Sequence, residues 1–224
     1  MSEVAVKEKE PLFSKKNKKL ITDPLNDTNP VTIQVLGICS ALAVTVKMDA
    51  ALVMSMAVLA VLIIGNVIVS LMRNMIPGKI RIIVQLVVVA ALVIIVDQVL
   101  KAFVYDVSKQ LSVFVGLIIT NCIIMGRLEA FALANKPWAS ALDGLGNGIG
   151  YGVILVVVAF FKELFGSGTL LGYEIFGNAT HMTGLYAMGY ENNGMMLLPP
   201  SSLVLVAIYI WIQKSRNPSL QEGH

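Results

Sequence analysis

The sequence predicts an all-α integral membrane protein with six transmembrane helices, arranged as two inverted three-helix repeats. Three observations carry this prediction. Of the 224 residues, 56% are hydrophobic and only 14% are charged, whereas a soluble domain of this size needs more charge on its surface. Two runs, 50–72 and 82–96, are apolar on every helical face, which is typical of lipid-exposed or deeply buried helices. A pattern of one short and two long apolar segments also occurs twice along the chain.

Six apolar segments follow one another along the chain. Their boundaries are marked by charged residues, by Pro77 and Gly78, and by a Gly- and Asn-rich stretch at 166–194, which is the one substantial loop predicted. The sequence therefore divides into a polar tail (1–29), a membrane domain (30–213, with repeats at about 31–105 and 111–213) and a second tail (214–224). The predicted segments are 31–46, 50–73, 80–105, 111–125, 143–165 and 197–213.

The first and fourth segments are too short to cross a bilayer as ordinary helices. With sixteen and fifteen residues, they reach only about 23–24 Å at the helical rise of 1.5 Å per residue, against a hydrocarbon core of roughly 30 Å. Three crossings in each half bring the second half into the membrane from the opposite side. This is the arrangement of an inverted-topology repeat, in which functional sites lie near the bilayer midplane.

The distribution of basic residues predicts that both termini are cytoplasmic. With that orientation the cytoplasmic side receives thirteen of the seventeen Lys and Arg residues, and the outer side receives four: Lys47, Lys101, Lys109 and Lys162. No signal peptide is recognisable, because the first apolar run begins only near Val31. The net charge of +3 gives no indication of nucleic-acid binding, so we expect the basic N-terminal residues to form a solvated tail.

The two cysteines occupy equivalent places in the two short segments, Cys39 in the first and Cys122 in the fourth. The simplest interpretation is a pair of small, buried and inert side chains, because free Cys is among the most buried residue types. A disulfide is a second interpretation. The third is ligation of iron by thiolates. An iron–sulfur cluster needs four ligands, so this interpretation predicts a partner chain with a matching pair of cysteines.

Other residues have simpler first interpretations. Glycines at every second position from 144 to 152 predict close helix packing, with residues 144, 148 and 152 on one face and residues 146 and 150 on another. Asp97 stands four residues before Lys101, so an ion pair on one helix face is expected. A place on a cation pathway is the functional alternative for Asp97 and, less strongly, for Asp143, because carboxylates inside membranes mark such routes. Glu163, next to Lys162, is predicted at the membrane interface.

The stretches around the cysteines resemble the D subunits of the bacterial Na⁺-translocating NADH:quinone reductases. They read QVLGICSALAVT at 34–45 and KQLSVFVGLIITNCIIMGR at 109–127. The shorter runs VDQVLKA at 96–102, EAFA at 129–132 and DGLGNG at 143–148 resemble them too, and the resemblance covers about 27–213. The E subunit of the related Rnf-type ferredoxin:NAD⁺ reductase is an alternative, but it has Pro after the first cysteine, where this chain has Ser40.

The resemblance implies a redox function in the bacterial inner membrane. In that family, the D and E subunits form a pseudo-symmetric pair of opposite topology, and two cysteines from each hold an iron centre described as a [2Fe-2S] cluster. Carried over by motif, Cys39 and Cys122 are ligands of that centre or of another iron centre. It relays electrons from the F subunit towards a covalent FMN on the C subunit, and the A and B subunits complete the sodium pump. A stand-alone secondary transporter and a purely structural subunit are the alternative functions.

Overall fold

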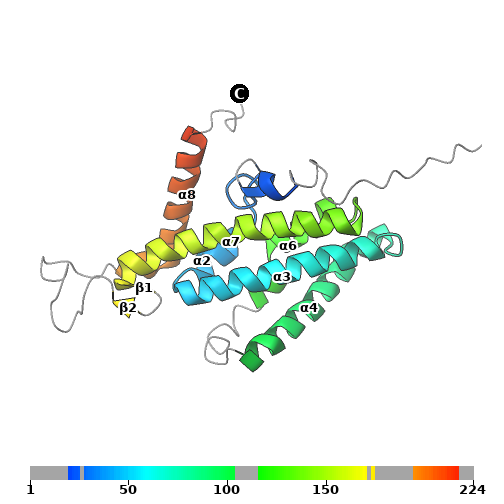
Figure 1. The fold of residues 1–224 in the computed structure, drawn as a ribbon, viewed down its shortest axis with the longest axis horizontal. Coiled ribbons are helices and arrows are strands. Elements are labelled where there is room, and N and C mark those ends of the chain that lie inside the picture. The colour runs from blue at the N-terminus through cyan, green and yellow to red at the C-terminus, as the bar shows by residue number, and fades with distance from the viewer. Residues whose placement is uncertain (1–19, 26–27, 104–115, 171–172, 175–193, 217–224) are drawn as a thin grey trace, which may run out of the picture.

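The computed structural model describes residues 20–25, 28–103, 116–170, 173–174 and 194–216, and these are almost entirely helical (Figure 1). The only strands within them are the two-residue β1 (Thr169–Leu170) and β2 (Tyr173–Glu174), which pair antiparallel. The predicted N-terminal residues 1–19, the start of the fourth segment (111–115), most of the loop and the last eight residues lie outside the described residues. The all-helical class is confirmed.

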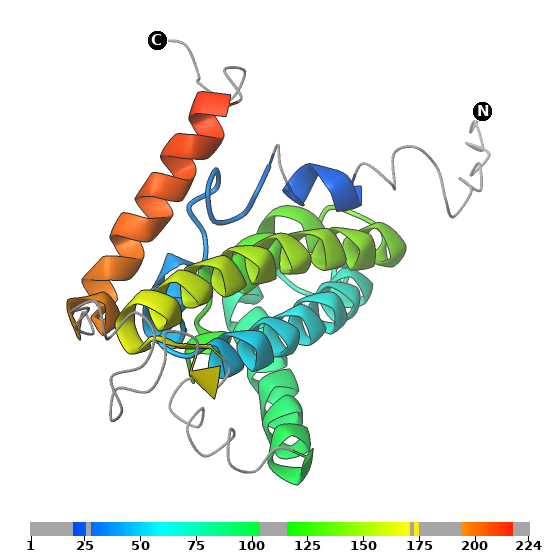
Figure 2. The ribbon, with the colours of Figure 1, turned by 60° about the vertical axis from the view of Figure 1, so that its left-hand side comes forward.

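Two long antiparallel helices form the centre of the protein. They are α3 (Met48–Met72) and α7 (Pro137–Ser167), which lie side by side in Figures 1 and 2. The contacts between them show the antiparallel packing, because residue numbers rise along α3 as they fall along α7: Ser55 meets Gly152, Leu59 meets Gly148 and Leu62 meets Gly144. Helix α7 begins six residues before the predicted segment, because Pro137 stands at the first helical turn, where its missing N–H costs no hydrogen bond.

Three helices are long and apolar enough to cross a membrane among the residues that the structure describes. They are Met48–Met72, Gly78–Ala102 and Pro137–Ser167. The second combines the short 3₁₀ turn η2 (Gly78–Ile80) with α4 (Arg81–Phe103), which descends from the end of α3 in Figure 1. The last predicted segment corresponds to α8 (Pro199–Arg216), which follows the 3₁₀ turn η5 (Gly194–Leu197). The six crossings and the inverted repeat stay a prediction.

Both faces of the glycine-rich helix α7 are covered, as the sequence predicts. Residues 144, 148 and 152 face α3. On the other face, the main chain of residues 20–24, which overlaps the 3₁₀ turn η1 (Asp23–Leu25), lies so close that an added Cβ at Gly146 would be 2.6 Å from the carbonyl oxygen of Leu20. A Cβ at Gly150 would be equally close to that of Pro24. Part of the segment that the sequence assigns to a polar tail is therefore packed against the helical core.

Buried polar contacts join α7 to α8 and to the start of α3. Lys162, whose side chain is completely buried, donates to Ser202 Oγ at 2.9 Å, and Ser202 Oγ lies 3.3 Å from Thr45 Oγ1. Glu163 is also buried, and its Oε2 accepts a hydrogen bond of 2.7 Å from the backbone N–H of Met48. Both side chains are therefore buried within the protein, where they bind groups of neighbouring helices. The interfacial depth predicted for Glu163 stays a prediction.

Candidate functional site

The first cysteine lies at the start of a short helix that follows an irregular stretch. The sequence predicts a helix over 31–46, but α2 extends only over Ile38–Val44. Upstream, the side chain of Asn29 accepts hydrogen bonds from the N–H groups of Val31 and Thr32, which holds this part in a turn. Gly37 then adopts the left-handed conformation, with φ of +81°, which glycine reaches without steric cost. Cys39 is the second residue of the helix after this break.

The second cysteine has an equivalent position in the fourth segment. Residues 116–119 are helical, the chain breaks at Thr120 and Asn121, and α6 (Cys122–Arg127) begins with the cysteine and passes into the π-helical turn η3 (Leu128–Ala132). Asn121 is extended and caps the new helix, because its Oδ1 accepts from the N–H of Ile123 at 3.2 Å. Each cysteine is therefore placed by a break in its segment, which the sequence indicated only as an unusually short apolar run.

The two breaks meet inside the protein through a small polar network. Asn121 Nδ2 lies 3.3 Å from Ser40 Oγ, and Ser40 Oγ lies 2.6 Å from the hydroxyl of Tyr151 on α7. All three side chains are buried, at 2% exposure for Ser40, 4% for Asn121 and none for Tyr151. The sequence motifs include Ser40 and Asn121 but predict no contact between them; the Asn before an apolar helical run is a capping signal that points to the second break.

Both cysteines are free and exposed on the surface of this chain. Burial within this chain is therefore wrong for both side chains, and so is a disulfide between them. Within the described part of the chain there is no group of three or more His, Cys, Asp or Glu side chains that could hold a metal ion. The donor set fits half of an iron–sulfur centre: two exposed thiols on adjacent helix starts, with the remaining thiolates still to be supplied.

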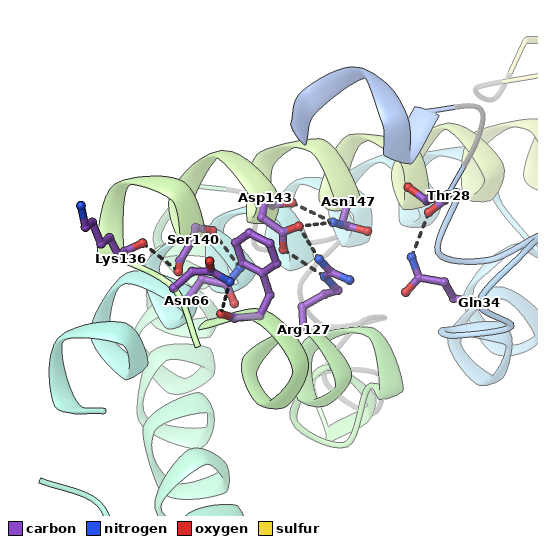
Figure 3. Close-up of polar contacts among 10 residues, drawn as sticks. Thr28, Gln34, Asn66, Arg127, Lys136, Ser140, Asp143 and Asn147 are labelled. Atoms are coloured by element: carbon purple, nitrogen blue, oxygen red, sulfur yellow. Dashed lines mark hydrogen bonds and ion pairs between the residues drawn. The ribbon is translucent and has the colours of Figure 1, made fainter. Parts of the chain in front are cut away.

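The acidic residues singled out by the sequence both have basic partners. Asp97 Oδ2 accepts from Lys101 Nζ at 2.5 Å, which confirms the expected pair on one helix face. Asp143, which is 3% exposed, accepts a fork of two hydrogen bonds from the guanidinium of Arg127, with Nε to Oδ2 at 2.9 Å (Figure 3). Asn147 Nδ2 donates to the same carboxylate at 3.1 Å. Arg127 is part of the second cysteine motif but was assigned no role from the sequence.

A cavity of about 230 Å³ lies beside this ion pair. It is lined by the N-terminal segment, by α6 and η3, and by α7, and it is partly open. Its polar lining includes Asp23, Thr28, Gln34, Arg127, Asp143 and Asn147. Two of the lining residues are joined by a hydrogen bond of 2.9 Å, which Gln34 Nε2 donates to the carbonyl oxygen of Thr28 (Figure 3). The Oδ1 atom of Asn147 is buried without a hydrogen-bond partner among the described residues. The cavity is thus bordered by a neutralised carboxylate, and one of its lining residues, Asn147, has a buried amide oxygen without a partner among the described residues.

These features define a class: a polytopic helical membrane protein with a pair of exposed thiols set at breaks in two of its segments. A family model for Rnf-Nqr subunits, described as membrane proteins, matches residues 17–210. The chain belongs to this family. The match begins earlier than the motifs indicate, so it includes the residues around η1 that pack on α7.

Several curated relatives are similar over nearly their whole length. The D subunit of the Na⁺-translocating NADH-quinone reductase of Photobacterium profundum is 54% identical over 212 residues, which are 94% of this chain and 98% of the relative. Its counterpart in Shewanella loihica is 52% identical over 210 residues, with the same coverage, and that in Shewanella denitrificans is 51% identical over 209 residues, 93% of this chain and 97% of the relative. The resemblance to D subunits is confirmed.

Proposed function

We propose that this chain is the D-type membrane subunit of a Na⁺-translocating NADH–quinone reductase, an oxidoreductase complex, and that Cys39 and Cys122 supply half of an iron–sulfur centre within it. The observation that carries the proposal is the exposure of both thiols at helix breaks that are joined by the buried contact between Ser40 and Asn121. The similarity to D subunits over 94% of the chain supports the complex to which it belongs.

The chain's own residues bind and orient in this proposal. A [2Fe-2S] cluster or another iron centre supplies one-electron transfer when bound, and the two thiolates hold it from one side. The other ligands come from the homologous six-helix E subunit with two cysteines, since four thiolates complete such a site. The A, B, C and F subunits are the further partners, with F as the electron donor and C as the acceptor. We place the chain in the bacterial inner membrane with both termini cytoplasmic, in accord with its basic residues.

Removing either thiol tests the proposal. In the purified complex, Cys39→Ser and Cys122→Ser should each lower iron and acid-labile sulfide by the amount of one centre, because a hydroxyl is a poor replacement for a thiolate ligand. NADH-driven quinone reduction should fall by about 10-fold or more, given the 10–100-fold losses that even weaker changes around metal sites produce. Ser55→Ala, which removes a hydroxyl from α3, is the control. Unchanged iron content and quinone reduction in both cysteine variants would contradict the proposal.

The alternative functions give different results in the same variants. A stand-alone secondary transporter predicts solute uptake by this chain alone in proteoliposomes and full activity without cysteines. A structural subunit predicts an iron-free chain whose loss affects only assembly. An Rnf-type E subunit predicts that the complex exchanges electrons between ferredoxin and NAD⁺ and does not reduce quinone. The thiol pair favours a redox function, since neither of the first two alternatives requires it.

We also propose that Asp97 and Asp143 lie on the route of the transported cation. The polar residues that line the cavity beside Asp143 support a polar path there. Asp97→Asn should raise the Na⁺ concentration for half-maximal quinone reduction by about 10-fold, the equivalent of one charged contact. Stability should change little, because an exposed i,i+4 pair contributes only about 0.3–0.5 kcal/mol. Lys101→Gln, which breaks the same pair but keeps the carboxylate, is the control, and an unchanged Na⁺ requirement in Asp97→Asn would contradict this role.

A further inference from the structure

We propose that Tyr151 is a positioning residue for the iron half-site, which locks the two cysteine-bearing breaks at the spacing and orientation that one iron centre needs. This role rests on the proposed function. Tyr151 lies in the middle of α7 and belongs to neither cysteine segment. Its hydroxyl contacts Ser40, the neighbour of Cys39, and Asn121, the neighbour of Cys122, at 2.6 and 3.5 Å.

The donors and acceptors in this network leave one consistent arrangement of hydrogens. Ser40 has a single hydroxyl hydrogen, which it donates to the carbonyl oxygen of Gly37 at 2.8 Å. Tyr151 must then donate to Ser40 Oγ. Asn121 accepts from Ile123 through Oδ1, so its Nδ2 group points the other way and donates to both hydroxyls. Every member is satisfied, and a fully satisfied buried network specifies one geometry.

The tyrosine ring also fixes the first break by direct contact. A Cβ added at Gly37 would be 2.9 Å from Tyr151 Cε2 and 3.6 Å from Asn121 Oδ1. The ring therefore packs against the main chain at the left-handed residue that precedes α2, while its hydroxyl reaches the residue after Cys39. This contact sets the position of the first break relative to α7. The hydrogen bond to Asn121 sets the position of the second break relative to the first.

Local structure alone gives these turns little rigidity. Helix α2 has seven residues, and α6 together with the turn η3 that continues it has eleven. Both are below the roughly 12–15 residues at which isolated helices become even marginally stable. The thiols are exposed on the two turns, whereas the side chains of Ser40 and Asn121 are buried against Tyr151. The network thus lies behind the thiols and acts on them through the backbone of adjacent residues, in the way that hydrogen-bonded neighbours orient metal ligands.

The test compares Tyr151→Phe and Ser40→Ala with wild type in the purified complex. Tyr151→Phe keeps the ring against Gly37 and removes only the hydroxyl. Tyr209→Phe, in α8 and outside the network, is the matched control. We expect both network variants to assemble, to lose iron to a chelator about 10- to 100-fold faster than wild type, and to show an altered absorbance spectrum and midpoint potential of the centre. Tyr209→Phe should match wild type in all three measurements.

A second measurement reports on thiol spacing without iron. Phenylarsine oxide bridges two thiols only when they are close together, so the full-length chain in detergent should bind it, and Tyr151→Phe should bind it about 10-fold more weakly. Wild-type chelator resistance, spectrum and arsenical binding in Tyr151→Phe and Ser40→Ala would overturn the inference, and if Tyr151→Phe does not assemble, Ser40→Ala decides. Cys39→Ser, measured alongside, separates the two proposals. If this variant keeps its iron, the proposed function fails. If it loses its iron while both network variants behave as wild type, only the role of Tyr151 fails.

Discussion

Replacing Arg127 with Met should destabilise the folded chain by about 3–5 kcal/mol, the usual cost of breaking a buried ion pair by removing one partner. Arg127 and Asp143 are 15% and 3% exposed, and the pair is a bidentate fork with additional support from Asn147. The substitution leaves a carboxylate buried without its counter-charge. The guanidinium also lies 5.3 Å from the centre of the Phe131 ring, so this contact is lost as well. Thermal unfolding in detergent should show a midpoint lower by about 6–20 °C.

Arg81→Met is the matched control, because it removes an arginine from an exposed pair. Arg81 and Glu129 are 43% and 37% exposed, and exposed pairs contribute about 0–1 kcal/mol. The double variant Arg127→Met with Asp143→Leu should recover part of the loss, because replacing both charges by apolar groups leaves no charge buried without a partner. Equal destabilisation by Arg127→Met and Arg81→Met would show that the buried pair is not a significant source of stability.

The second large effect is expected from Gly144→Val at the contact between α3 and α7. A Cβ at this position would be 2.9 Å from Asn66 Nδ2, 3.2 Å from the carbonyl oxygen of Leu62 and 3.3 Å from Ile63 Cα. Two of these neighbours are backbone atoms of α3, so they move only if the helices separate. Asn66 Nδ2 donates to the carbonyl oxygen of Ser140 at 3.0 Å, and the valine displaces it. Overpacking of this kind costs about 1–3 kcal/mol, and here the lost hydrogen bond adds about 1 kcal/mol.

The same substitution at Gly78 provides the control, because no atom lies within 4 Å of a Cβ placed there. We expect Gly144→Val to lower the amount of folded chain recovered from membranes and its unfolding midpoint, and Gly78→Val to leave both near wild type. An unfolding midpoint for Gly144→Val equal to that of Gly78→Val would mean that close contact between α3 and α7 does not depend on glycine. The unfolding midpoint is measured by thermal unfolding in detergent, and the amount of folded chain is measured as the yield after extraction from membranes.

The features that follow correctly from the sequence are those with a local signal. The long apolar runs that correspond to α3, α4 and α7 can be recognised in the sequence, because length and hydrophobicity are enough to identify a candidate membrane-spanning helix. The pair of Asp97 and Lys101 and the two glycine faces of α7 follow from helical spacing alone. In each case the interacting residues are close in sequence or belong to one repeating pattern, so no knowledge of the chain's path is needed.

The short segments show where this reasoning failed. The first was predicted as one helix over 31–46, because its residues are apolar, and yet only Ile38–Val44 is helical. The left-handed Gly37, against which the Tyr151 ring packs, and the turn held by Asn29 interrupt it. The exposure of the cysteines was not decided by the sequence either, because the usual burial of free Cys and a site shared with a partner chain predict opposite results.

By itself, the sequence determined that this is a helical membrane protein of the Rnf-Nqr family, and that Cys39 and Cys122 occupy equivalent places in it. Hydrophobicity and motif identity are properties of consecutive residues, so they can be read without a structure. Only the tertiary structure decided that Ser40 meets Tyr151 across 111 positions, that Arg127 pairs with Asp143, and that the glycines of α7 receive the N-terminal segment. These contacts join residues distant in sequence or on separate helices, and their formation depends on how the helices pack, which no local pattern specifies.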